Sequence, residues 1–288
     1  MKLDDPQWLE EQYNNRARVP EHGEYFDRWA RESARVRDSQ ACALDIAYGP
    51  ANGERLDVFP AANGAKDAPV LVFIHGGYWR SLDKSDHSFV APAFTQAGTC
   101  VVVPNYDLCP AVTIPEIVMQ MVRAIAWTWR HVAEHGGDPR RITVAGHSAG
   151  GQLAAMLLAC RWKEVDAALP EDLVPRALSI SGLYDLEPLR RTPSMQQALR
   201  LTPEQVRQAS PALLPAPARG ALYTVAGGKE SMEFLRHNEL IRQAWGRERV
   251  PVCEALPGLN HFSVLEALVE PGHRLNGLAM EMLGKKQG

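Results

Sequence analysis

One serine stands in a setting that would make it a nucleophile. Ser148 lies in the run 146–150, Gly-His-Ser-Ala-Gly, which matches the pattern Gly-x-Ser-x-Gly. The apolar run 141–145 before it and the alanine-rich run after it predict a strand, a tight turn and a helix. Such a turn is strained and exposes the hydroxyl, and glycines two positions away on either side avoid a collision. We therefore predict that Ser148 attacks an ester or amide carbonyl and forms an acyl-enzyme.

A glycine loop earlier in the chain could stabilise the negative charge that this attack creates. An apolar run leads into His-Gly-Gly-Tyr-Trp at 75–79. Glycines let backbone N–H groups approach the oxyanion, and each such donor contributes about 3–4 kcal/mol to transition-state stabilisation. We predict an oxyanion hole made by the N–H groups of Gly77, Tyr78 and Ala149, the last from the serine turn. His75 is expected to brace the loop rather than to transfer protons.

The proton of Ser148 needs a base, and the last histidines of the chain are the candidates. Proteins with this strand–serine–helix turn carry their nucleophile, acid and histidine in that order. Only His261 and His273 lie beyond the last apolar run, 250–255, and His273 sits in a Pro-Gly-His turn. His261 is therefore predicted as the general base.

A carboxylate is expected to orient His261 and to stabilise its protonated form. Glu230 follows the apolar run 221–226 after a short glycine loop and is the acid that we favour. Asp185, which follows the run 176–181, is the alternative, because such an acid can also follow that earlier run.

A separate pattern, His-Val-Ala-Glu-His at 131–135, matches the zinc-ligand spacing of some peptidases. These residues end a predicted helix, where histidines favourably meet the negative end of the helix dipole, and no third ligand is evident. The five cysteines are odd in number, scattered and without a C-x-x-C pair. We expect no metal site.

The elements that would position these residues alternate along the chain. Two short runs, 42–48 and 55–59, are expected as antiparallel edge strands. Continuously apolar runs follow, as expected of strands that helices cover on both faces; they are 69–75, 99–103, 141–145, 176–181, 221–226 and 250–255. Helices are predicted between them at 115–135, 151–160, 231–245 and 263–269. The sequence predicts an α/β fold with a mostly parallel central sheet.

We expect residues 1–288 to form one domain with two additions to the sheet. Residues 1–40 carry aromatic side chains at helical spacing and are predicted as a helical extension outside the sheet, which could border a pocket. Residues 187–219 are rich in Pro, Arg and Gln, with two brief helical stretches. They are predicted to form a small lid, because the loops at the carboxyl ends of parallel strands carry the site in such folds.

Charge and composition indicate which classes of partner to expect. The 31 basic and 34 acidic residues are mixed along the chain and give a net charge of −3, so the sequence has no excess of positive charge that would favour nucleic acid or an anionic membrane. The first residues include acids where a secretory signal would be apolar, and no apolar run is long enough to span a membrane. We expect a cytoplasmic protein that acts on a small molecule, and the sequence leaves a homodimer open.

The motif at 75–79 resembles the H-G-G-x-W oxyanion motif of arylformamidases (kynurenine formamidases), a branch of the α/β-hydrolases. Similar features are Glu11-Gln-Tyr-Asn-Asn-Arg16, Ser181-Gly-Leu-Tyr-Asp185 and Glu230-Ser-Met-Glu-Phe234. The resemblance implies the α/β-hydrolase fold and the roles assigned above to Ser148, His261, Gly77 and Tyr78. It also implies hydrolysis of N-formyl-L-kynurenine to kynurenine and formate, without metal or organic cofactor. Members often carry Asp where Glu230 stands.

Three aromatic residues, Tyr78, Trp79 and Tyr184, are predicted to contact an aromatic leaving group. Two alternatives stay open. The same residues could serve a carboxylesterase, or a hydrolase of carbamates or aryl amides, with a different pocket. A non-catalytic interaction protein of the same fold is the third hypothesis, although such a protein is expected to lack the nucleophile, the base or the oxyanion loop.

Overall fold

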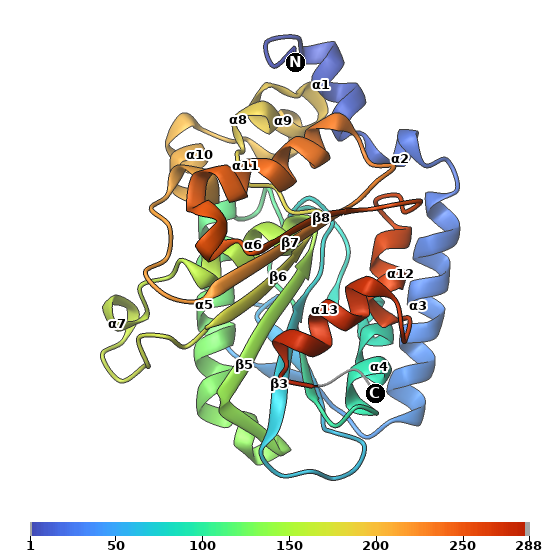
Figure 1. Ribbon diagram of the computed structural model, residues 1–288, viewed down its shortest axis with the longest axis vertical. Coiled ribbons are helices and arrows are strands. Elements are labelled where there is room, and N and C mark those ends of the chain that lie inside the picture. The colour runs from blue at the N-terminus through green and yellow to red at the C-terminus, as the bar shows by residue number, and fades with distance from the viewer. Residues whose placement is uncertain (1, 286–288) are drawn as a thin grey trace.

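One twisted sheet of eight strands forms the centre of the protein (Figure 1), in a computed structural model that describes residues 2–285. The strand order is β1-β2-β4-β3-β5-β6-β7-β8. The strands are β1 (Ala43–Ala47), β2 (Arg55–Phe59), β3 (Ala68–Ile74), β4 (Cys100–Pro104), β5 (Gly137–His147), β6 (Arg176–Ile180), β7 (Ala221–Gly227) and β8 (Val252–Leu256). The first two pair antiparallel and the other six run parallel, which confirms the predicted α/β architecture.

Helices cover both faces of this sheet (Figure 1). One face carries α5 (Ile114–His131), which continues as the 3-10 turn η3 (Val132–His135), together with α6 (Ala149–Leu158) and α11 (Met232–Arg249). The other carries α3 (His22–Ser39), α4 (Ala91–Thr95), α12 (Ser263–Val269) and α13 (Arg274–Met282). Short pieces are η1 (Lys84–Asp86), η2 (Ser88–Val90) and α7 (Trp162–Val165). The four predicted helices are present, whereas α4, α7 and α13 were not predicted.

The central strands are buried on both sides, as their continuous apolar character predicts. Along β3, Val70, Val72 and Ile74 pack into the core beneath α5 and α6. Leu71 and Phe73 point the other way, into the core beneath α3, α4, α12 and α13. Because successive side chains of a strand point to opposite faces, one strand contributes to both cores. The resulting rigid sheet fixes the positions of the loops at its carboxyl end.

Two segments gather above that end of the sheet (Figure 1). The N-terminal segment forms α1 (Pro6–Tyr13) and α2 (Asn15–Arg18), and α1 contacts the second segment. That second segment contains α8 (Glu187–Arg191), α9 (Pro193–Leu199), α10 (Pro203–Ala209) and the 3-10 turn η4 (Pro211–Leu213). It therefore has three α-helices where two were predicted. Each begins with a proline in its first turn, where the fixed φ and the missing N–H are compatible with a helix.

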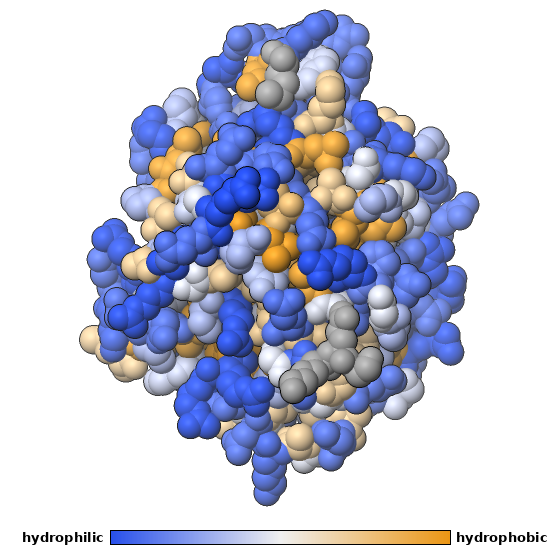
Figure 2. Space-filling view, viewed as in Figure 1, coloured by the Kyte–Doolittle hydropathy of each residue, from blue (hydrophilic) through white to orange (hydrophobic). Residues whose placement is uncertain are grey.

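Polar residues cover most of the face in Figure 2, and apolar side chains show through in small patches over its upper half. Within residues 2–285, no helix has the length and apolar character needed to cross a bilayer.

Candidate active site

The turn between β5 and α6 holds Ser148 in a strained conformation. Its φ of 57° and ψ of −116° are rare for a residue with a side chain, and such strain costs about 1–3 kcal/mol. An added Cβ at Gly146 would lie 2.1 Å from the carbonyl oxygen of Gly150. At Gly150, an added Cβ would lie 2.1 Å from the carbonyl oxygen of Ile74. Both glycines of the motif are therefore needed for the close approach of β3, β5 and α6 at this turn.

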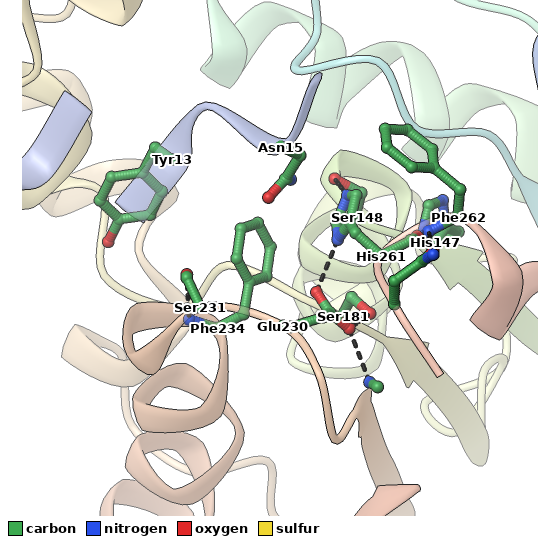
Figure 3. A network of polar contacts seen from close by, with 12 residues as sticks. Tyr13, Asn15, His147, Ser148, Ser181, Glu230, Ser231, Phe234, His261 and Phe262 are labelled. Atoms are coloured by element: carbon green, nitrogen blue, oxygen red, sulfur yellow. Dashed lines mark hydrogen bonds and ion pairs between the residues drawn. The ribbon is translucent and has the colours of Figure 1, made fainter. Parts of the chain in front are cut away.

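Three predicted site residues form a hydrogen-bonded line (Figure 3). Nε2 of His261, in the loop after β8, lies 3.1 Å from Oγ of Ser148. Nδ1 of the same ring lies 2.6 Å from Oε2 of Glu230, in the loop after β7. Asp185, the alternative acid, instead accepts a hydrogen bond from the N–H of Glu187. Within residues 2–285, Glu230 is the carboxylate that pairs with His261.

The other oxygen of Glu230 is held by two donors that the sequence analysis did not assign. The Ser181 hydroxyl donates to Oε1 at 2.5 Å, and the N–H of Gly227 donates to it at 2.6 Å. These bonds leave Oε2 directed at His261. Ser181 opens the Ser-Gly-Leu-Tyr-Asp motif, so its place after β6 was the available signal. The longer glutamate side chain is accommodated because both its oxygens have partners.

His147, the residue before Ser148, fixes the loop that carries His261. Its Nε2 lies 2.8 Å from the carbonyl oxygen of His261, and since a carbonyl only accepts, Nε2 carries the proton. Burial, followed by the nearby imidazole of His261, lowers the pKa of His147 well below its ordinary value. His147 is therefore neutral at pH 7 and serves as a donor to the backbone.

The loop after β3 places the predicted oxyanion donors beside Ser148. Gly77 has a φ of 104° and Tyr78 a φ of 51°, so the chain turns back sharply at this point. An added Cβ at Gly77 would lie 2.0 Å from the carbonyl oxygen of Ser81. Within the part of the chain that the structure describes, the N–H groups of Gly77, Tyr78 and Ala149 have no acceptor. Ala149 begins α6, where the first N–H groups of a helix are free.

His75 braces this loop from below, as predicted. Its ring stacks on Tyr106 with the centroids 4.3 Å apart, and Nε2 lies 3.0 Å from Oδ1 of Asn105. The Tyr106 hydroxyl donates to the carbonyl oxygens of His75 and Gly76, at 3.0 and 3.1 Å. Burial lowers the pKa of His75, so the ring is neutral and suited to packing.

Two predicted substrate contacts are corrected by the structure, because Trp79 and Tyr184 are fully buried and border no part of the cavity at Ser148. Trp79 points into the core and donates from Nε1 to Gln152 of α6, at 3.1 Å. The Tyr184 hydroxyl lies 2.7 Å from the hydroxyls of Ser179 and Thr224, beneath the sheet end. Of the three predicted aromatic residues, Tyr78 alone borders the cavity.

The cavity above Ser148 has a volume of about 160 Å³. We call its lower side the sheet-side wall; it consists of Gly77, Tyr78, Arg80, Ser81, Leu82, His147, Ser148, His261 and Phe262. We call its upper side the cap-side wall; it consists of Glu10, Tyr13, Asn14, Asn15, Arg16, Phe26, Trp29, Ser194 and Met195. The expectation that residues 1–40 border a pocket is confirmed. The N-terminal segment supplies more of this wall than residues 187–219 do.

Hydrogen bonds join the two walls. The Tyr78 hydroxyl donates to the carbonyl oxygen of Tyr13 at 2.7 Å and accepts from Nδ2 of Asn15 at 3.3 Å. Figure 3 shows Asn15 on the segment that passes above Ser148 and Phe234. Tyr78, which follows Gly77 in the loop after β3, therefore also holds the N-terminal segment over Ser148.

The zinc-like pattern at 131–135 lies at the end of α5 and in η3, before the first residue of β5, whereas Ser148 follows the last residue of that strand. Nδ1 of His131 is 3.0 Å from the carboxylate of Glu134, and its ring stacks on Trp127. Within residues 2–285, no three His, Cys, Asp or Glu side chains come together as a metal site would require.

Comparison with known proteins relates the chain to hydrolases. The model of a family with the alpha/beta hydrolase fold matches residues 71–232. Kynurenine formamidase of Danio rerio is 30% identical over 257 residues, which cover 87% of this chain and 85% of that protein. Esterase LipQ of Mycobacterium tuberculosis is 37% identical over 151 residues, which cover 49% of this chain and 35% of that protein. A crystal structure from Silicibacter sp. TM1040, provisionally described as a thioesterase, has a TM-score of 0.80 and 31% identity over 92% of this chain and 96% of that one.

Proposed function

The chain belongs to the α/β-hydrolase family, in its arylformamidase-like branch, and is a hydrolase; from this premise we propose that it cleaves an N-formyl aryl amide through an acyl-enzyme. The proposed reaction converts N-formyl-L-kynurenine into L-kynurenine and formate. The observation that carries the proposal is the hydrogen-bonded line of Ser148, His261 and Glu230, which opens into a cavity bordered by Gly77 and Tyr78.

In the first step, Ser148 attacks the formyl carbon while Nε2 of His261 takes the hydroxyl proton. The 3.1 Å distance between these atoms is within reach of such a transfer. Glu230 accepts a hydrogen bond from the protonated Nδ1 of the ring and stabilises the imidazolium that forms. Since Ser181 and Gly227 hold the carboxylate, His261 keeps the orientation that the transfer requires.

The carbonyl oxygen becomes negatively charged in this step. The free N–H groups of Gly77, Tyr78 and Ala149 are placed to bind it, and each is worth about 3–4 kcal/mol in the transition state. The N-terminal end of α6 adds a favourable dipole at the same point. The C–N bond then breaks as His261 gives its proton to the departing aryl amine.

Water completes the reaction. His261 takes a proton from a water molecule, whose oxygen attacks the formyl ester on Ser148. The bond between the formyl carbon and Oγ breaks, Ser148 regains its proton from His261, and formate leaves. All proton transfers in the cycle pass through the ring of His261, which Glu230 binds at Nδ1, while His147 binds the backbone carbonyl oxygen of the same residue.

The choice of an N-formyl aryl amide as substrate rests on similarity. The relative from Danio rerio, named kynurenine formamidase, matches along most of both chains. A second candidate function is a carboxylesterase of short acyl esters, or a hydrolase of carbamates or other aryl amides, with the same residues. The match to an esterase over about half of this chain favours that candidate.

A comparison of specificity constants tests the proposal. We expect kcat/KM for N-formyl-L-kynurenine to exceed that for p-nitrophenyl acetate, although the ester is intrinsically easier to cleave. The Ser148→Ala variant serves as the background for both. If the rate on formylkynurenine equals this background while the ester is clearly hydrolysed, the formamidase proposal is wrong and the carboxylesterase is the better description.

A further inference from the structure

Two arginines face the cavity without an acidic partner. Arg16 lies in α2 on the cap-side wall, and Arg80 lies in the oxyanion loop on the sheet-side wall. Within residues 2–285, neither side chain forms an ion pair. In residues 187–219, Arg190 and Arg191 bind Glu187 and Arg207 binds Glu204, whereas Arg200 and Arg219 form no ion pair with the described residues. What sets Arg16 and Arg80 apart is that they are unpaired and also line the cavity, where their donors can meet a ligand.

The one carboxylate that lines the cavity is engaged elsewhere. Oε1 of Glu10 accepts from the Ser194 hydroxyl at 2.6 Å, and Oε2 accepts from the Ser194 N–H at 3.1 Å. Glu10 therefore holds α9 against the N-terminal segment. Arg16 and Arg80 outnumber it, so the residues that line the cavity carry an excess of positive charge.

Arg16 is already held in place for a ligand. Its guanidinium lies over the ring of Phe26, 5.4 Å from the centroid, which is a favourable cation–π distance. A guanidinium stacked by its face keeps its edge N–H donors free, and these donors match the two oxygens of a carboxylate. Arg80 follows Tyr78 by two residues, so its backbone is fixed by the loop that binds the oxyanion.

We propose that the cavity takes substrates that carry a carboxylate, and that Arg16 and Arg80 bind this group while Ser148 attacks the acyl carbon. Phe26, Trp29 and Phe262 supply an apolar wall for the part of the substrate between the two ends. The proposal rests on the proposed serine hydrolase but not on the formamide bond. It assigns the two arginines to substrate selection, a role separate from the bond-breaking of Ser148 and His261.

A matched pair of esters tests this selection independently of formamide cleavage. One is an aryl acetate with a propanoate side chain on the ring, and the other is its primary amide, which has the same shape and no charge. Hydrogen bonds to a charged group imply a preference of about 10- to 100-fold in kcat/KM for the carboxylate. In Arg16→Gln/Arg80→Gln we expect this preference to fall to near unity. Arg18→Gln, which alters an exposed arginine of α2 outside the cavity, should retain it.

Binding without turnover gives a second readout. Calorimetry on the Ser148→Ala protein should show 3-benzoylpropionate, an aryl ketone with a carboxylate, binding at least about tenfold more tightly than its amide. The double arginine change should remove this difference. Equal affinity for the acid and the amide, or a preference that survives the double change, would overturn the proposal. Failure of formylkynurenine hydrolysis with the ester preference intact would instead reject the formamidase and leave the carboxylate site standing.

Discussion

The sheet-side wall and the cap-side wall of the cavity meet above Ser148, but different interactions hold them. The sheet-side wall consists largely of residues at the ends of strands whose apolar side chains are buried on both faces of the sheet. The cap-side wall is held by polar contacts between distant segments. The Tyr13 hydroxyl donates to Glu233 at 2.7 Å, and the two residues are 220 positions apart.

This difference indicates that bond-breaking and substrate selectivity depend on different parts of the molecule. The groups that we assign to bond-breaking, Ser148, His261 and Glu230, all stand on the rigid carboxyl end of the sheet. Most groups that we assign to the shape and charge of the cavity, among them Arg16, stand on the cap-side wall, and Arg80 is the exception on the sheet-side wall. Changes to Ser148, His261 or Glu230 should therefore reduce turnover of every substrate, whereas changes in the cap-side wall should alter selectivity or stability.

The largest effect is expected from the sheet-side wall. Ser148→Ala and His261→Ala should each lower kcat by roughly 10⁴-fold or more on esters and amides alike, because the two residues act as one unit. The urea midpoint should stay close to that of the unchanged protein. If either variant kept substantial turnover on any substrate, the bond-breaking role of this wall would be wrong.

The choice between two acids gives the next largest effect. We expect Glu230→Ala to lower kcat by about 10³- to 10⁴-fold, because His261 loses the group that sets its tautomer. Asp185→Ala is the matched control, and it should change kcat by less than about threefold, since within residues 2–285 its carboxylate accepts from the N–H of Glu187 and forms no hydrogen bond with His261. The reverse ranking in steady-state assays would transfer the role to Asp185.

A buried hydroxyl tests the cap-side wall. Tyr184 donates its N–H to Nδ1 of His237, so Nε2 of that ring carries a proton and donates to the Tyr13 oxygen at 2.9 Å. Tyr13→Phe leaves this donor unpaired and should lower the free energy of unfolding by about 1–3 kcal/mol. The control, Tyr223→Phe, removes an exposed hydroxyl and should cost less. Equal urea midpoints for the two variants would show that the polar network does not hold the cap.

The pH dependence of stability involves four buried histidines, of which His147 belongs to the sheet-side wall. Burial lowers the pKa of His75, His147 and His237, and that of His87 to about 3. The unfolded chain binds protons at these rings near pH 6.5 and the folded chain does not, so stability is lost as the pH falls below that value. Each ring should contribute up to about 1.4 kcal/mol per pH unit. Urea unfolding at pH 7.5 and 5.5 measures this change, and we expect a lower free energy of unfolding at pH 5.5. His87→Gln should make the free energy of unfolding depend less steeply on pH. A greater stability at pH 5.5 than at pH 7.5 would contradict the prediction.

The sequence predicted the sheet-side wall because its signals are local. The run at 146–150 and its flanking strand and helix specify the turn, and chain order selects His261. The choice between Glu230 and Asp185 stayed open, because both follow parallel strands and only the folded loops show which carboxylate meets the imidazole.

The cap-side wall was foreseen as a helical region that could border a pocket, but not in its contacts, because residues far apart in the chain make them. For example, the Ser194 hydroxyl donates a hydrogen bond to Glu10, 184 positions away in the chain, and no local sequence pattern marks such a pair. The wrong expectation for Trp79 has a similar origin. Its φ of 54° turns the side chain into the core toward Gln152, and the sequence does not reveal that direction.

The most direct test of the central claim is covalent labelling of the folded protein with a fluorophosphonate, followed by intact-mass and peptide analysis. We predict one adduct per chain, on Ser148, that is absent from Ser148→Ala and forms far more slowly in His261→Ala. A folded protein that takes no label, or that takes it on another residue, would contradict the assignment of Ser148 as the nucleophile.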